Sequence, residues 1–424
     1  MRIPHVARLV ALGLALSIAV SAQDASSYMD QAVKAYEAKD YPAFLENMRR
    51  AAALRPNHPR IIYNLASAYA LNGNSAAAVA GLERLAGMGL SMPAAKDSDF
   101  ASLASDPSFA KIVARFADNA KPAGHATVAF TLPDKGVVAE GVAFDPTHRT
   151  WYVSSVHLRK IYAVDSKGRA RVFADNLDAL WGAFGLAVDA RRRVLWVTTS
   201  WMPQVAGCTP ENDGRAGLAR FDLATGKLTG AFTLPNTPKG HAIADLAISP
   251  AGDVYVTDSK SAAVYRLPAN GTALEPVIEG EPFLSPQGLA FSADGKRLYV
   301  ADYSRGLFVV DTSTRRAAPV GYGDSVCLQG IDGLATYKGA LVAVQNGIRP
   351  HRVVRLTLDT AGTTVTRLDV LAAALPEFDE PTLGTVVDGA FYFVASSGWR
   401  TIDDAGKLSP EADLRNPVVM RTGL

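Results

Sequence analysis

The chain has 424 residues, of which 48% are apolar and 20% are charged, and its formal net charge is +2. This length allows two domains, and the composition is that of an ordinary globular protein. The basic residues are scattered rather than gathered on one face, which excludes the electrostatic footprint of a nucleic-acid-binding protein.

The first 22 residues predict a secretory signal peptide. Arg2 and Arg8 supply a positive start, Leu9–Val20 an apolar stretch too short for a good membrane span, and residues 20–22 are small, before a cut ahead of Gln23. An uncleaved N-terminal anchor is the alternative. Because no other apolar run is long enough to cross a bilayer, we expect a periplasmic or secreted protein with no membrane span after signal removal.

Residues 23–120 predict a small helical domain. Apolar side chains recur at helical spacing from Tyr28 to Phe44, and small residues at close-packing positions in the next hairpin resemble the tetratricopeptide pattern. About two repeats are present, fewer than a free solenoid usually needs. The domain is therefore expected either to pack on the rest of the chain or to bind a protein partner.

One short phrase recurs six times after a linker near Pro122, and each copy is followed by a turn and a β-branched, aromatic run. The first copy is Glu140-Gly-Val-Ala-Phe-Asp, followed by Trp151-Tyr-Val-Ser-Ser. The copies are about 43 to 60 residues apart, the period of four-stranded propeller blades. The small residue of the phrase occurs at Ala143, Ala187, Ala247, Ala290, Ala335 and Gly384. Residues 121–424 thus predict an all-β, six-bladed β-propeller.

The two ends of this region predict how the ring closes. The last segment, 417–423, reads as the third strand of the sixth blade, which lacks a fourth. Residues 128–132, just before the first blade, read as a fourth strand. We expect the N-terminal strand to complete the last blade, because closure removes exposed edges. This arrangement would place the helical domain beside the sixth blade.

Polar residues begin the innermost strand of four blades, at one rim of the channel. They are Glu140, Asp245, Gln287 and Asp332. Carboxylates held this close repel one another unless a cation lies between them, and Ca²⁺ accepts six to eight oxygen ligands in irregular geometry. We predict a Ca²⁺ site here, with another divalent cation as an option. The alternative is that these residues only form turns, as Asp before Gly often does.

The chain at this point resembles the six-bladed, calcium-dependent propellers of the senescence-marker-protein/gluconolactonase, paraoxonase and strictosidine-synthase type. The resemblance covers roughly residues 126–424 and is carried by the phrases around the four rim residues. Glu140 and Asp332 match the family's metal ring, whereas Asp245 and Gln287 stand where the family has Asn. The resemblance implies a cation that polarises a carbonyl or lactone oxygen.

The loops at the same rim contain candidates for the proton transfer and for the substrate pocket. His157, His241 and Asp258 are the candidate catalytic groups. The candidate pocket residues are Trp181, Phe184, Trp201 and Asn346. Alternatively, each His is only a solvated loop residue. An equal alternative for Trp181 and Phe184 is that they fill the channel in blade two, rather than form the pocket.

The leading function is an exported, calcium-dependent hydrolase of a small-molecule lactone or ester. The alternative is a non-catalytic propeller that binds a ligand or protein, with the helices as a second interaction surface. Cys208 and Cys327 are the only cysteines. They either form a disulfide, which an oxidising compartment permits, or are two free thiols.

Overall fold

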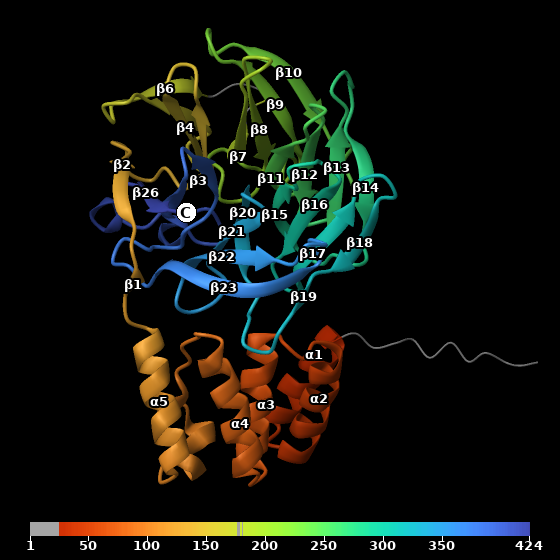
Figure 1. Cartoon of the computed structure of the whole chain (residues 1–424), viewed down its shortest axis with the longest axis vertical. Coiled ribbons are helices and arrows are strands. Elements are labelled where there is room, and N and C mark those ends of the chain that lie inside the picture. Colours follow the sequence, from red (N-terminus) through yellow and green to blue (C-terminus); the bar gives the residue numbers. More distant parts are fainter. Residues whose placement is uncertain (1–24, 176–178, 180) are drawn as a thin grey trace, which may run out of the picture.

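The structure, a computed structural model, describes residues 25–175, 179 and 181–424 (Figure 1). A layer of five α-helices lies against one side of a ring of six antiparallel sheets. A six-bladed β-propeller preceded by an N-terminal helical segment is the fold class that the sequence predicted. The predicted signal peptide lies outside the described residues.

The helical layer consists of two hairpins and a closing helix. The α-helices are α1 (Ala25–Glu37), α2 (Tyr41–Leu54), α3 (Pro59–Leu71), α4 (Ser75–Gly87) and α5 (Pro107–Asn119), with 3₁₀ turns η1 (Ala94–Lys96) and η2 (Ser98–Leu103) before α5. The side chains of Asp40, Asn74 and Asp106 accept hydrogen bonds from backbone amides in the first turns of α2, α4 and α5. These contacts satisfy amides that have no partner within the helix and so define where each helix begins. No helix in the described part of the chain is long and apolar enough to cross a membrane.

Each blade has four antiparallel strands, ordered from the channel outward. Blade one is β3 (Ala139–Asp145), β4 (Thr150–Ser155), β5 (Lys160–Val164) and β6 (Ala170–Asp175); blade two is β7 (Gly182–Asp189), β8 (Val194–Ser200), β9 (Ala216–Asp222) and β10 (Leu228–Thr233). Blade three is β11 (Ile243–Ile248), β12 (Val254–Asp258), β13 (Ala263–Leu267) and β14 (Glu275–Glu279); blade four is β15 (Pro286–Phe291), β16 (Arg297–Asp302), β17 (Gly306–Asp311) and β18 (Arg316–Pro319).

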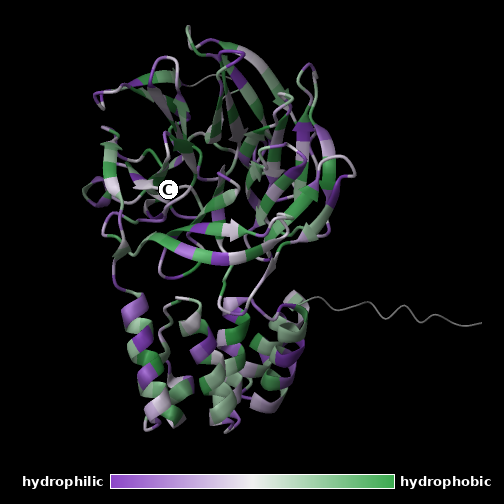
Figure 2. Cartoon of the chain, viewed as in Figure 1, coloured by the Kyte–Doolittle hydropathy of each residue, from purple (hydrophilic) through white to green (hydrophobic). Residues whose placement is uncertain are grey.

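Blades five and six have additions. Blade five is β20 (Ile331–Tyr337), β21 (Ala340–Gln345), β22 (Arg352–Leu358) and β23 (Thr364–Ala373), with β1 (Ala123–Gly124) and β19 (Gly321–Tyr322) both pairing with β23. Blade six is β24 (Gly384–Val387), β25 (Ala390–Ser396), β26 (Val418–Gly423) and β2 (Thr127–Thr131), with 3₁₀ turns η3 (Trp399–Thr401) and η4 (Glu411–Asp413) between β25 and β26. The outer strand β23 alternates between hydrophilic and hydrophobic residues along much of its length (Figure 2), because one of its faces is exposed.

The ring closes through the N-terminal strand, as the sequence predicted. Strand β2 pairs antiparallel with β26, with Thr127 opposite Arg421 and Thr131 opposite Val418. Beyond the strand, the Leu132 amide donates to the Pro417 carbonyl at 3.0 Å. Strand β2 therefore covers the edge that the C-terminal strand β26 would otherwise expose.

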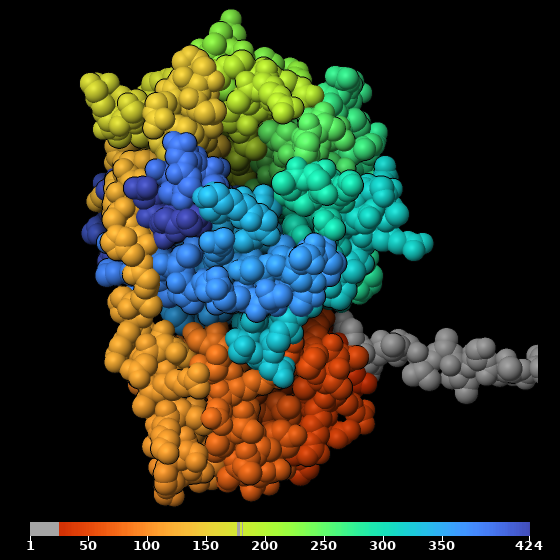
Figure 3. Space-filling view, viewed as in Figure 1, coloured from red at the N-terminus to blue at the C-terminus, as the bar shows by residue number. Residues whose placement is uncertain are grey.

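The helical layer shares its core with blade five and only borders blade six, so the sequence-based placement beside blade six is corrected to blade five. Cys327 and Ile348 of blade five share one apolar core with helical residues such as Leu85. The loop that follows β19 reaches down onto the helices, where Arg84 Nη2 lies 2.9 Å from Asp324 Oδ1 (Figure 3). The reason is the linker: β1 first pairs with β23 of blade five, and only then does the chain cross to blade six.

A buried arginine joins the two parts of the molecule. Arg352 of β22 is 1% exposed; its Nη1 donates to the Met88 carbonyl at 3.0 Å and its Nε donates to Gln345 Oε1 at 2.7 Å. Close by, the Ser91 amide donates to the Arg349 carbonyl at 2.8 Å. The helical layer is thus packed on the propeller, and the end of α4 is held by hydrogen bonds from blade five.

Candidate functional site

A β-bulge occurs at the same place in the innermost strand of blades one to five. The register shifts lie between Ala139 and Val142 in blade one and at the equivalent points of the next four blades. A bulge bends the strand and redirects a side chain. The first residue of each bulge is Glu140, Phe184, Ala244, Gln287 or Asp332, and Asp245 is the second residue of its bulge, where the other blades have Gly. The recurring phrase therefore encodes a backbone distortion at the end of the channel.

Small residues in the phrase allow neighbouring blades to approach closely. A Cβ added at any of four bulge glycines would lie within 3.0 Å of atoms of the next blade. These glycines are Gly141, Gly185, Gly288 and Gly333. Hydroxyls of the second strand tie the same points together: Ser154 Oγ accepts from the Gly141 amide at 2.7 Å and donates to the Phe184 carbonyl at 2.6 Å. The bulges are thus held rigidly, and so are the side chains that they direct.

A cavity of about 210 Å³, here called the mouth cavity, lies at this end of the channel. It is lined by Glu140, Phe184, Met202, Ala242, Ile243, Ala244, Ser259, Gln287, Tyr303, Asp332, Asn346, Glu380 and Trp399. Three of the four predicted metal ligands therefore face one cavity. The fourth, Asp245, lines the central channel of about 380 Å³ that runs between the blades.

The three carboxylates of this group are buried and poorly neutralised. Burial, followed by the charge of Asp332, raises the pKa of Glu140 well above its ordinary value. Burial also raises the pKa of Asp245 to about 8, with a further contribution from Asp332, and that of Asp332 to about 7. Each residue is at most 8% exposed. Removal of these carboxyl groups from water therefore disfavours their charged forms, and their mutual repulsion adds to the effect.

Each carboxylate has a hydrogen bond that orients it. Trp399 Nε1 donates to Glu140 Oε2 at 2.6 Å, and Asn346 Nδ2 donates to Asp332 Oδ2 at 2.6 Å. The Leu246 amide donates to Asp245 Oδ1 at 2.8 Å. The second oxygens of Glu140 and Asp332 accept no hydrogen bond within the described part of the chain. They are free to serve as ligands.

The donor chemistry fits a hard cation better than a soft one. The ring offers carboxylate and carboxamide oxygens, which suit Ca²⁺. As placed, however, no group of three or more His, Cys, Asp or Glu side chains is close enough to hold one ion, across residues 25–175, 179 and 181–424. A cation would need the side chains to rotate inward from rigidly placed backbone positions.

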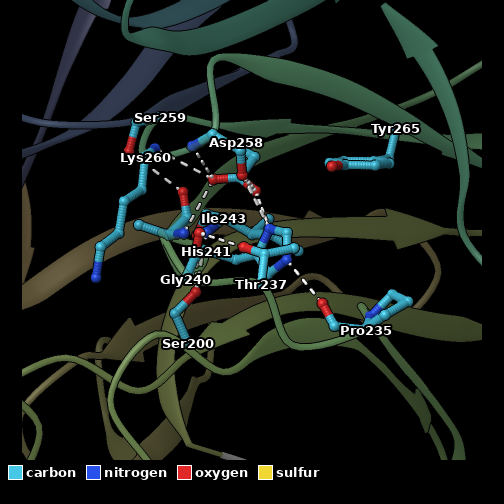
Figure 4. A network of polar contacts seen from close by, with 12 residues as sticks. Ser200, Pro235, Thr237, Gly240, His241, Ile243, Asp258, Ser259, Lys260 and Tyr265 are labelled. Carbon is cyan, nitrogen blue, oxygen red and sulfur yellow. Dashed lines mark hydrogen bonds and ion pairs between the residues drawn. The ribbon is translucent and has the colours of Figure 1, made fainter. Parts of the chain in front are cut away.

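The structure places His241 and Asp258 in a network beside the cavity rather than in its lining (Figure 4). His241 Nδ1 lies 2.5 Å from Asp258 Oδ2, and Nε2 lies 2.9 Å from the Pro235 carbonyl. Ser261 Oγ also contacts Nδ1, at 2.9 Å. Asp258 Oδ1 accepts from the amides of Ala242, Lys260 and Ser261. Both ring nitrogens are thus engaged, and the pair orders the loop before β11.

His157, the other candidate base, is also absent from the cavity lining. Its Nδ1 lies 2.7 Å from the Gln204 carbonyl, and its own carbonyl accepts from the Ala206 amide at 3.0 Å. His157 therefore holds the long loop of blade two against blade one.

Two of the four predicted pocket residues, Phe184 and Asn346, line the cavity. The rings of Phe184 and Trp399 stack with their centroids 6.5 Å apart. Trp181 and Trp201 stack on each other at 6.5 Å and belong to the same apolar cluster as Phe184, without reaching the cavity. They support its wall from behind.

Sequence reasoning missed Trp399 as a site residue; it noted Glu380 at the entry of blade six and Tyr303 in a rim loop, but included neither in the predicted site. Trp399 lies in the loop after the second strand of blade six. The equivalent loops of the other blades were the ones from which the candidate catalytic residues were chosen. Glu380 has φ +55°, an uncommon conformation for a residue with a side chain, which often marks functional sites. Tyr303 donates to Asn346 Oδ1 at 2.9 Å, and burial raises its pKa.

The two cysteines are free thiols in separate places. Cys208 belongs to the apolar cluster around Trp201, and Cys327 to the core shared with the helices. The disulfide alternative is therefore not realised.

No protein-family model matches the chain, and no curated protein matches it. Solved structures do match. A luciferin-regenerating enzyme has a TM-score of 0.50 at 17% identity, covering 71% of this chain and 96% of its own. A gluconolactonase from Xanthomonas campestris has a TM-score of 0.45 at 19% identity, covering 72% and 98%. The calcium-binding protein regucalcin from Agrobacterium tumefaciens has a TM-score of 0.46 at 19% identity, covering 71% and 96%. The luciferin-regenerating enzyme thus shares its fold with this chain over 71% of the chain's length.

Proposed function

We propose that the mouth cavity binds a divalent cation, Ca²⁺ in the first instance, and hydrolyses a lactone or ester bond of a small molecule. The observation that supports this most is the set of three buried carboxylates with raised pKa values around one end of the channel. Such a set is costly without a counter-charge, and sites of this kind are frequently functional.

Glu140, Gln287 and Asp332 would hold the ion at the mouth cavity, which all three line, and Asp245 would reach it from the adjoining central channel. A cation bound there would polarise the carbonyl oxygen of the substrate. Asn346 keeps Asp332 in place, and Trp399 does the same for Glu140.

Glu380 is the general base that we propose, in place of His157, His241 or Asp258. It lines the cavity, and burial raises the pKa of its carboxyl group. Because it is not one of the four ring residues, it can take a proton from an attacking water. Arg400 and Arg349 act against this rise in the pKa of Glu380 and so favour its charged, basic form.

The aromatic wall would exclude water and cover the ring of a bound lactone. Phe184 and Trp399 stack on one side, and Met202 adds a flexible apolar contact. Exclusion of bulk water strengthens the electrostatic interactions in the cavity.

The test is a screen of simple lactones and esters with added Ca²⁺ or with chelator, on the wild type and on Glu380→Gln. We expect hydrolysis that requires the metal, and a variant that keeps its Ca²⁺ affinity but loses most of its turnover. Hydrolysis that is unchanged in chelator would contradict the proposal.

A non-catalytic, ligand-binding propeller is the second candidate. It is favoured by the finding that no three potential ligands converge as placed, among the residues that the structure describes. Ligand binding without turnover by any lactone or ester in the screen would support it. A protein partner for the outer face of the helices, and export to the periplasm or beyond, stay predictions.

A further inference from the structure

A second cleft, of about 510 Å³, lies where the helical layer meets blades five and six. It is lined by Ser91, Met92, Pro93, Ala120, Arg349, Pro350, His351, Ala374, Leu375, Phe378 and Arg400. The helical layer provides one wall and the propeller provides the other. We refer to it as the Arg349/Arg400 cleft.

Arg349 is positioned at this cleft by its neighbours. Its Nη1 contacts His351 Nε2 and donates to the Asn346 carbonyl at 3.3 Å. A guanidinium can only donate, so Nε2 of His351 must carry the lone pair. Burial, followed by the charge of Arg349, lowers the pKa of His351 to about 4, which keeps the ring neutral and able to accept.

Arg400 contributes the second guanidinium, and its side chain is about half exposed, with its donors open to the cleft. Its Nε lies 3.7 Å from Asp379 Oδ1 and 4.0 Å from Glu380 Oε2, which are ion-pair rather than hydrogen-bond distances. It donates no hydrogen bond within the described part of the chain. The backbone of Ser91 is bonded to that of Arg349, so the helical layer holds this side of the cleft in place.

Both arginines line the same cleft, so one ligand can contact both. Burial, followed by the charge of Arg400, lowers the pKa of Arg349, as expected for two cations near each other. An oxyanion between them would relieve this repulsion and fill the unused donors, as planar guanidinium groups do for carboxylates and phosphates. Met92, Pro93, Leu375 and Phe378 add an apolar wall.

The cleft adjoins the mouth cavity through two residues. Asn346, whose carbonyl accepts from Arg349, lines the mouth cavity, and so does Glu380, the ion-pair neighbour of Arg400. Trp399, next in the chain to Arg400, donates to Glu140. A ligand in one site is therefore near the other.

We propose that the Arg349/Arg400 cleft binds the carboxylate or phosphate group of an organic anion with an apolar body, and that this anion is the substrate of the mouth cavity. The second half rests on the proposed function. The helical layer then has a specific purpose, which is to complete the site that selects anionic lactones or esters.

The first experiment measures binding to the full-length protein in chelator, by calorimetry, so that neither metal nor turnover is needed. The probes are 3-phenylpropionate, phenyl phosphate and the neutral 3-phenylpropanamide. We expect at least one anion to bind and the amide to bind at least about tenfold more weakly, because loss of a charge-assisted hydrogen bond has an effect of this size. Which anion binds more tightly distinguishes carboxylate from phosphate.

Matched variants locate the binding. Arg349→Gln and Arg400→Gln should each weaken anion binding by about tenfold or more. Arg171→Gln, an exposed arginine on β6 of blade one, should bind as the wild type does. Equal binding of the acid and the amide, absence of binding by both anions, or unchanged binding by both cleft variants would overturn the proposal.

The second experiment compares hydrolysis of a lactone that carries a free carboxylate with that of its methyl ester, in the presence of Ca²⁺. We expect Arg349→Gln to raise KM for the acid at least about tenfold more than KM for the ester, since any effect of Arg349 on Glu380 acts on both substrates. If the ester is hydrolysed as well as the acid by the wild type, the cleft does not select the substrate, although the mouth cavity is an active site. If the anions bind but no lactone or ester is hydrolysed, the assignment of the anion as a substrate falls, together with the proposed function.

Discussion

Replacement of Asp332 by Asn should remove most of the stabilisation of the propeller by calcium and should stabilise the metal-free protein. The substitution removes one of three buried carboxylates but keeps an oxygen that can accept from Asn346. In excess calcium, the ion binds the folded wild-type protein and not the unfolded chain. At a hundred times its dissociation constant, this ligand stabilises the fold by about 2.7 kcal/mol.

The corresponding shift in melting temperature follows from the size of the propeller. An unfolding entropy of about 2.1 cal/mol/K per residue, over roughly 300 residues, amounts to about 0.6 kcal/mol/K. Calcium should therefore raise the wild-type midpoint by about 4 °C. If Asp332→Asn weakens binding by roughly a hundredfold, the same calcium concentration stabilises it by about 0.4 kcal/mol, less than about 1 °C.

In chelator, Asp332→Asn should raise the stability of the protein instead of lowering it relative to the wild type. The folded state raises the pKa of Asp332 from 3.8 to about 7, so the folded protein binds more protons than the unfolded chain between these values. Stability is then lost as the pH rises through this window, by up to an amount on the order of 4 kcal/mol. At pH 8 and without metal, Asp332→Asn should be the more stable protein.

The assay is thermal unfolding at pH 8 of the wild type, Asp332→Asn and the exposed control Asp404→Asn, each with calcium and with chelator. Asp404→Asn should follow the wild type in both conditions. The reasoning is refuted if the wild-type midpoint is the same with calcium and chelator, or if Asp332→Asn is the less stable protein in chelator.

Three further outcomes are expected. Deletion of residues up to Pro133 should expose the edge of β26 and cause aggregation, seen by size-exclusion chromatography; a soluble, cooperatively unfolding product would contradict the closure argument. A chain that begins at Lys121 should melt at a lower temperature, because it uncovers Cys327 and Ile348, but should bind Ca²⁺ with unchanged affinity in a titration, since all four ring residues remain. If Glu380 is the base, hydrolysis should fall as the pH drops through its raised pKa; Arg400→Gln should move this limb of the pH–rate profile to higher pH, because Arg400 lowers that pKa, and an unmoved limb would exclude Glu380.

Much of the fold could be predicted from the sequence, because the information is periodic. The phrase that begins at Glu140 repeats with the spacing of propeller blades, and its glycine is required where neighbouring blades come within contact of each other. The strand at 128–132 could be matched to the incomplete last blade for the same reason. The local sequence pattern and the closure of the ring point to the same structure here, so the ordinary rules for strands are enough to predict the blades.

The sequence also identified which residues begin the innermost strands, but not how they face the channel. Asp245 lies on the channel rather than in the mouth cavity, and Trp399 enters the cavity from a loop with no repeated pattern. Asp245 is the second residue of its bulge, where the other four bulges have Gly, and Ala244 takes the position that Glu140 has in blade one. The alignment of Leu246-Ala247 with Leu289-Ala290 already indicates this offset of one residue.

The placement of the helices and the environment of the histidines were decided only by the tertiary structure. A two-residue strand, β1, is too short to give a sequence signal, yet it sets the helical layer against blade five. His241 is spaced like a rim residue, but both of its nitrogens are occupied by groups from other segments, Asp258 and Pro235. Arg349 and Arg400 are 51 positions apart in the chain and become one cationic cleft only because two blades and the helices meet there, since long-range contacts leave no local trace in the sequence.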